Sequence, residues 1–212
     1  MHIPEHFRAS DAEALIERLA RRSAGLLITI GGDGSLCAAH APILWDASAK
    51  IARGHIARAN PQWRQGAGKG LLVLSGAEAY ISPGWYASKA EHGKAVPTWN
   101  YEAVHLTGAV GWFDKRERLE AVVRDLSALH EGGREQPWGL DDAPRDYIDA
   151  MLRGIVGFEL RAEKVEAKRK LSQNKSGADI EGVLNGLEAE ADVGAREMAA
   201  LMRALRAGTS EA

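Results

Sequence analysis

Apolar and polar residues follow the pattern of β-strands in seven runs within the first 175 residues. Such runs occupy residues 26–30, 36–45, 50–56, 70–75, 77–81, 101–113 and 155–171. Residues that favour turns separate them, for example the segment GGDGS at 31–35. Six or seven short strands joined by tight turns predict an antiparallel barrel or sandwich with peripheral helices. The pattern does not predict the strand order.

Helical spacing of apolar residues appears between these strands and after them. It predicts helices that begin near Ser10, at the capping pattern of Asp114 and after Pro144, and a short helix at Asn60. Two further apolar sets with helical spacing follow Ser176. The sequence therefore predicts a β domain over residues 1–175 and a C-terminal helical extension over residues 176–212.

Composition narrows the functional class. The net charge of −2 argues against a wholly basic nucleic-acid binder. Cys37 is the single cysteine, which excludes an internal disulfide and a cysteine-based zinc cluster and fits a reducing compartment. The apolar runs are too short to span a bilayer, and the first residues lack a signal-peptide profile. We expect a soluble cytoplasmic protein without a membrane partner.

Aromatic side chains gather in one part of the chain. Three of the six tryptophans and three of the four tyrosines lie between Asn60 and Tyr101, several beside turn residues. Planar side chains near loops suit a flat aromatic ligand. The alternative interpretation is a barrel core with aromatic rims.

The segment RGHIARANPQW at 53–63 is the strongest candidate for anion binding. A strand would deliver His55 and Arg58 to its end, and Asn60 would cap the following helix. A helix N-terminus beside an arginine suits a phosphate. Alternatively, Arg58 pairs with a surface carboxylate and His55 is an ordinary barrel residue.

Other polar residues give weaker signals. His40, His55, His92 and His105 follow no metal-binding motif, so we predict no metal site. The basic run at 161–175 contains offsetting glutamates, which weaken an interpretation as a DNA-binding segment. No catalytic residue can be identified.

Several longer segments together resemble the PaiB-like family, described as FMN-binding negative transcriptional regulators of bacteria. They are IPEHF at 3–7, RGHIARANPQW at 53–63, YISPGWY at 80–86 followed by Lys89, HGKAVPTWNY at 92–101 and KLSQNK at 170–175. The segments span nearly the whole chain in the same order.

The resemblance implies a split β-barrel of the FMN-binding type, the fold of pyridoxamine-phosphate oxidases and small flavin reductases. It also implies a homodimer with FMN between the subunits. The implied cofactor-binding residues are His40, Pro42, His55, Arg58, Asn60, Thr98, Trp99, Asn100 and Lys170. Arg58 and Asn60 would hold the phosphate, and Thr98, Trp99 and Asn100 would meet the ring or its polar edge. The arginine and lysine phosphate motif of the oxidases is absent, because residues 38–43 read AAHAPI.

Three functions follow from this resemblance. The first is an FMN-binding negative regulator that binds DNA or acts through another regulator. The second is an FMN-dependent oxidoreductase related to the pyridoxamine-phosphate oxidases or flavin reductases. The third is a haem-binding protein with His40 or His55 as the axial ligand.

Overall fold

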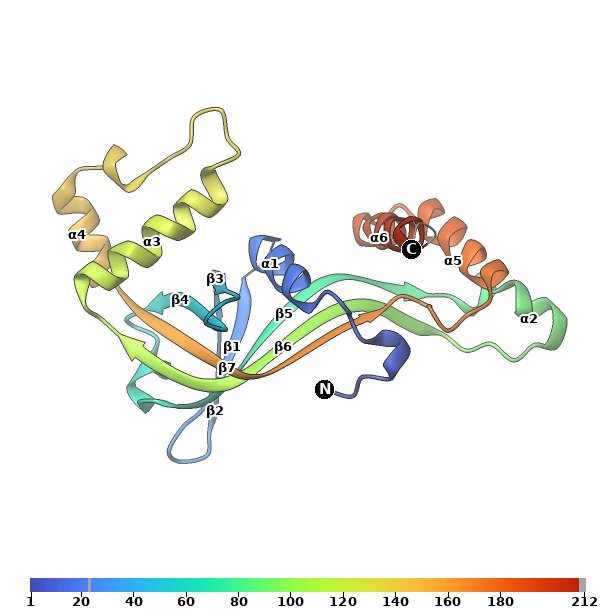
Figure 1. The fold of residues 1–212 in the computed structure, drawn as a ribbon, viewed down its shortest axis with the longest axis horizontal. Coiled ribbons are helices and arrows are strands. Elements are labelled where there is room, and N and C mark those ends of the chain that lie inside the picture. The colour runs from blue at the N-terminus through green and yellow to red at the C-terminus, as the bar shows by residue number, and fades with distance from the viewer. Residues whose placement is uncertain (23, 210–212) are drawn as a thin grey trace. The chain divides into compact units, whose positions relative to one another are not determined.

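The computed structural model describes residues 1–22 and 24–209, except for the side chains of residues 208 and 209. Its seven strands form one sheet in the order β2-β1-β5-β6-β7-β4-β3 (Figure 1). The strands are β1 (Gly25–Ile30), β2 (Leu36–Ala41), β3 (Ile43–Asp46), β4 (Ile51–Ala57), β5 (Gly68–Ile81), β6 (Thr98–Phe113) and β7 (Ile155–Lys170). The α-helices are α1 (Ala12–Arg22), α2 (Ala87–His92), α3 (Arg116–Glu131), α4 (Arg145–Arg153), α5 (Gly177–Ala189) and α6 (Val193–Thr209). Short 3₁₀ helices are η1 (Glu5–Phe7), η2 (Pro61–Gln65), η3 (Pro83–Trp85) and η4 (Leu140–Asp142).

The described residues form two compact units. The first unit contains residues 1–10 and 75–103 and the chain from Ala167 onward, and the second contains Asp11–Leu74 and Val104–Glu166. The first unit packs Ile81 of β5 with Val183 and Leu187 of α5 and Met198 of α6. In the second unit, Leu119 and Val122 of α3 pack with Ile148 and Leu152 of α4 against Phe113.

The second unit shows why its sheet curls into a barrel. Strands β2 and β3 are separated by a single residue, Pro42, yet they lie at opposite edges of the strand order. The two edges must therefore approach each other, and β2 indeed contacts β4. Proline has no amide hydrogen to donate and interrupts a ladder at this point.

We call the place where the two sheet edges approach each other at Pro42 the seam. Gly54 shows how closely the chain packs there. It pairs with Ile43 of β3 and with Phe158 of β7. A β-carbon at Gly54 would lie 2.4 Å from the carbonyl oxygen of Pro42 and 2.8 Å from the Phe158 ring. The glycine of the RGHIARANPQW segment is therefore required by packing.

The structure corrects several predicted elements. The predicted strand at 36–45 is two strands, because Pro42 interrupts it, whereas the predicted strands at 70–75 and 77–81 are one strand, β5. Not all strands are short, since β5, β6 and β7 have 14, 16 and 16 residues. The prediction that a capping pattern at Asp114 begins α3 is wrong, because Lys115 occupies the N-cap of this helix and makes no side-chain hydrogen bond there. The predicted boundary between the β domain and the C-terminal extension at residue 175 stays a prediction. The last residues of that extension, 210–212, lie outside the described part of the chain.

The close packing at the seam predicts that alanine substitutions at two strand glycines differ strongly in their effect on stability. Gly54→Ala should destabilise the protein by about 1–3 kcal/mol, the usual cost of overpacking. Gly111→Ala on β6 is the matched control, because a β-carbon there meets nothing within 4 Å. Chemical denaturation of both variants measures the difference. Equal stabilities for the two variants would contradict the close approach at Pro42.

Candidate functional site

Five of the predicted site residues lie on or beside strands of the second unit, namely His40, Pro42, His55, Arg58 and Asn60. His40 is exposed on β2 opposite Leu26, and Pro42 is half-buried at the seam. His55 on β4 pairs with Gly157 and its Nδ1 is buried without a hydrogen-bond partner in the described structure. Burial lowers the pKa of the His55 imidazole, which favours its neutral form. Asn60 caps η2, as predicted, and its side chain accepts a hydrogen bond from the Gln62 amide at 2.9 Å.

Arg58, also in the second unit, already has several partners. Its Nε donates to the carbonyl oxygen of Arg153 at 2.8 Å, and its Nη1 lies 3.5 Å from Asp114. Its guanidinium lies 5.8 Å from the centre of the Trp63 ring, and Trp63 donates to the Arg58 carbonyl at 2.9 Å. These contacts close the loop between β4 and η2.

A pocket of about 240 Å³ surrounds the Arg58 guanidinium. Its charged lining residues are Arg58, Arg116, Arg153, Asp114 and Asp149. The formal charge of these five side chains is +1. The pocket can therefore attract an anion, although two carboxylates compete with it.

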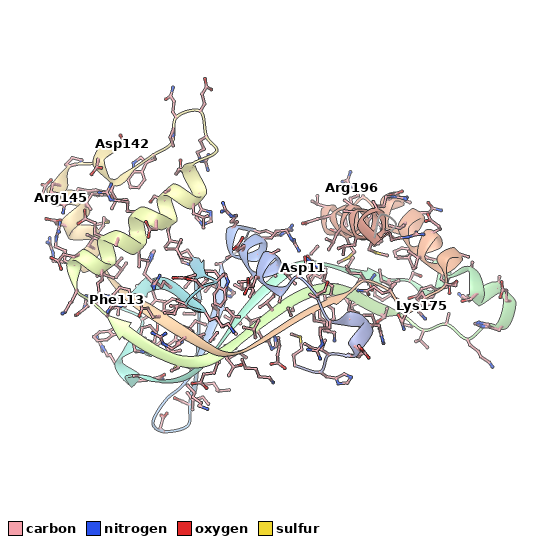
Figure 2. The ribbon with its side chains drawn as sticks, in the orientation of Figure 1. Asp11, Phe113, Asp142, Arg145, Lys175 and Arg196 are labelled. Carbon is pink, nitrogen blue, oxygen red and sulfur yellow. The ribbon has the colours of Figure 1, made fainter. Side chains whose placement is uncertain are left out.

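Three predicted residues of the first unit, Thr98, Asn100 and Lys170, meet in a pocket of about 190 Å³ that we call the basic pocket. It is lined by Phe7, Tyr86, Val96, Thr98, Asn100, Lys170, Ser172, Asn174 and Lys175. The lining contains two lysines and no carboxylate. Lys175 follows the turn after β7, where Figure 2 labels it.

Lys170 is fixed at the edge of this pocket by the first residues of β6. Its Nζ donates to the carbonyl oxygen of Trp99 at 2.6 Å and also contacts the hydroxyl of Thr98. Burial lowers the pKa of Lys170, and the positive charges of Lys168 and Lys175 lower it further. Since like charges raise the free energy of this ammonium group, an anion placed here would be stabilised.

The floor of the basic pocket holds a strained residue. Ser172 has a φ of +64°, which is uncommon for a residue with a β-carbon. Its hydroxyl and the Asn100 amide are joined by hydrogen bonds of 3.1 and 3.2 Å, and both residues are buried. The Gln173 side chain accepts from the Leu171 amide at 2.7 Å and fixes the same turn.

Tyr86 adds a buried hydroxyl without a hydrogen bond of normal geometry in the described structure. The residue is 4% exposed, and burial raises the pKa of its hydroxyl, an effect that the nearby Ser172 hydroxyl opposes. The Lys175 ammonium lies 4.7 Å from the centre of the Tyr86 ring. Sequence analysis missed Tyr86 and Lys175 as pocket residues, although both lie in the segments that carry the family resemblance.

Trp99 is separated from its two neighbours. Successive side chains of a strand point to opposite faces, so Trp99 faces away from Thr98 and Asn100. It lines a different pocket with Tyr80 and Trp85.

A third pocket of the first unit is less suited to an anion. It has a volume of about 340 Å³ and includes Arg8, Arg169 and Arg206. Arg169 is paired with Glu102 at 3.0 Å, and Arg206 contacts Glu181. Two of its three cations are therefore already compensated.

The Arg169–Glu102 pair connects the two strands that build the basic pocket. Glu102 lies on β6 and Arg169 on β7, and their side chains are 0% and 11% exposed. Arg169 immediately precedes Lys170 on β7, and Glu102 lies two residues after Asn100 on β6. The pair therefore adds a side-chain contact to the backbone pairing of β6 with β7, the strands that carry Thr98, Asn100 and Lys170.

Neither a metal centre nor a membrane segment is found in the described part of the chain. No group of three histidine, cysteine, aspartate or glutamate side chains there could hold a metal ion. No helix among those residues is long and apolar enough to cross a membrane.

Comparison with solved structures identifies the class of fold. The chain is similar to the FAD and haem binding protein of Mycobacterium smegmatis, with a TM-score of 0.56, 13% identity and coverage of 82% of this chain and 78% of that one. It is also similar to the flavocytochrome Anf3 of Azotobacter vinelandii, with a TM-score of 0.52, 12% identity and coverage of 83% and 73%. The predicted fold class, a mainly β split barrel with peripheral helices, is confirmed.

The family follows from the sequence. Residues 1–164 match the family described as "Putative FMN-binding domain", and the chain belongs to this family. It is 34% identical over 206 residues to the protease synthase and sporulation protein PAI 2 of Bacillus subtilis, covering 95% of this chain and 96% of that protein. The PaiB-like resemblance and the choice of FMN as cofactor are thereby confirmed.

The buried pair predicts a loss of stability that depends on whether one partner or both are replaced. Glu102→Leu should cost about 3–5 kcal/mol, because it removes the buried carboxylate that pairs with the largely buried Arg169 charge. Replacing both residues by leucine should recover most of this loss. Denaturation of the single and double variants tests this, with Glu188→Leu in the exposed pair with Arg203 as the control, expected near 0–1 kcal/mol. A small effect of Glu102→Leu would show that the pair does not hold the strands.

Proposed function

We propose that this chain is an FMN-binding negative regulator of gene expression that acts as a cytoplasmic homodimer. The observation that carries this proposal is the match to PAI 2 over nearly the full length of both chains. The name of that relative connects it with protease synthesis and sporulation, which are cellular programmes rather than a single reaction. The regulator either binds DNA or acts through another regulator.

The basic pocket fits the phosphate of FMN better than the Arg58 pocket does. It has a formal charge of +2 from Lys170 and Lys175, whereas the charged residues around Arg58 sum to +1. It also offers the Tyr86 hydroxyl, which has no other well-formed hydrogen bond in the described structure. The Lys170 ammonium has three donors, of which two already contact Trp99 and Thr98, so one remains for a phosphate oxygen. A phosphate dianion gains most from such charged donors. We therefore assign the phosphate to Lys170, Lys175 and Tyr86.

The volume of the basic pocket supports the proposed dimer. At about 190 Å³ it is smaller than the roughly 300 Å³ of typical small-molecule sites. It can hold the phosphate end of FMN, and the ring then needs additional surface. A second copy of the chain would supply that surface if FMN lies between subunits.

An FMN titration tests the cofactor and its phosphate site together. The purified protein should bind FMN, and Lys170→Met should weaken binding about ten- to hundredfold, because a charge-assisted contact contributes about 1.5–3 kcal/mol. Lys89→Met is the matched control, since Lys89 is an exposed lysine on α2. Quenching of flavin fluorescence on binding measures the affinities, and gel filtration gives the mass.

The Arg58→Ala variant decides between the two anion pockets. If it weakens FMN binding while Lys170→Met does not, the phosphate lies at Arg58. If neither variant has an effect, the phosphate lies outside both pockets. A protein that ignores FMN altogether would contradict the cofactor proposal.

An oxidoreductase is the second candidate, because two flavoproteins share the fold. FMN supplies hydride and electron transfer, and the protein would position its ring. Bleaching of bound FMN by NADH would favour this candidate. For the regulator, we expect no bleaching and binding to the gene's own upstream DNA at low salt, where phosphate contacts are strongest. If deletion of the gene abolishes regulation although the protein does not bind this DNA, the protein acts through another regulator.

Haem binding is the third candidate. His55 presents a neutral imidazole with a buried, unpartnered Nδ1, which is the form that coordinates iron. His40 is exposed and has no such environment. A haem absorption band that survives His55→Ala and His40→Ala would eliminate both ligands.

A further inference from the structure

The pocket that contains Trp99 differs chemically from the basic pocket. It has a volume of about 550 Å³, within the range of small-molecule sites. Three aromatic residues, Tyr80, Trp85 and Trp99, and three acidic residues, Glu78, Glu190 and Asp192, line it. We call it the aromatic–acidic pocket.

Two of the aromatic rings lie near the surface, whereas Trp85 is partly buried against the core of the first unit. The rings of Tyr80 and Trp99 meet edge to face with their centres 6.1 Å apart, and these residues are 48% and 53% exposed. Trp85 is held from behind, because its indole fills the position that a β-carbon of Gly186 would occupy. The rings thus remain partly accessible on a rigid support.

The carboxylates of this pocket are uncompensated. Glu78, Glu190 and Asp192 form no ion pair in the described structure, and no basic residue lines the pocket. Asp192 uses one carboxylate oxygen to accept from the Ala195 amide at 2.8 Å. Arg196, labelled in Figure 2, is close in sequence, but its Nη2 donates to the Ala191 carbonyl at 2.9 Å.

We propose that the aromatic–acidic pocket binds an organic cation, a quaternary ammonium or a protonated amine. The faces of aromatic rings carry negative potential and attract such cations, and indole does so most strongly. Three carboxylates add long-range attraction and repel anions such as FMN. A bare metal ion is a poorer fit, because the described acidic groups do not gather within coordinating distance.

The proposal does not depend on the assignment of FMN. Trp99 lines the aromatic–acidic pocket, while its neighbours Thr98 and Asn100 line the basic pocket on the other face of β6. A cation and an anion could therefore be bound on opposite faces of the same strand segment.

Choline and its neutral isostere 3,3-dimethyl-1-butanol distinguish a cation site from a general apolar pocket. Isothermal titration of the full chain should show choline binding at least tenfold more tightly than the isostere, and added salt should weaken it. Trp99→Leu should weaken choline binding about tenfold, and Glu78→Gln should weaken it severalfold. Trp138→Leu is the control, because Trp138 is similarly exposed, at 44%, in the second unit.

The outcomes separate the proposal from its alternatives. Equal affinity for choline and the isostere would overturn it in favour of an apolar site. No choline binding at millimolar concentrations would also overturn it, as would loss of binding in Trp138→Leu. Glu78→Gln is a surface substitution, so it keeps the test valid if Trp99→Leu fails to fold. Failure of choline binding with normal FMN binding would leave the proposed function intact.

Discussion

The single-residue connection at Pro42 is the constraint on which the barrel depends. Strands β2 and β3 flank it in sequence and lie at opposite edges of the sheet, so one residue must connect two edges. The edges can meet only if the sheet curls, and proline ends one ladder without leaving an unpaired amide hydrogen. Gly54 completes the seam, since its missing side chain leaves room for the Pro42 carbonyl.

The RGHIARANPQW segment, which carries part of the family resemblance, thus has a structural explanation. Gly54 permits close packing, Asn60 caps η2, and Trp63 donates to the Arg58 carbonyl. Each of these three residues has a local role that needs no ligand. The segment was the strongest candidate for phosphate binding in the sequence, but its charged donors are largely committed to these contacts.

The sequence predicted most elements because their signals are local. Strand alternation, the Asn60-Pro61 helix start and the apolar spacing of α1, α3, α5 and α6 all correspond to observed elements. The strand order could not be predicted, because it depends on pairing between distant segments such as β4 and β7. The family resemblance named Thr98, Asn100 and Lys170, but they meet because β6 lies beside β7 in the sheet, where a buried ion pair, Arg169–Glu102, also links the two strands. Periodicity reveals neither the pairing nor the ion pair.

The alternation of β6 explains why neighbouring residues in one segment serve different pockets. Thr98 and Asn100 face two lysines, whereas Trp99 faces three carboxylates. The carbonyl of Trp99 nevertheless accepts a hydrogen bond from Lys170. The backbone of Trp99 thus contacts a cation, while its side chain lines a pocket with acidic residues. The two pockets therefore share one residue, with the backbone carbonyl of Trp99 bonded to Lys170 and its indole lining the aromatic–acidic pocket.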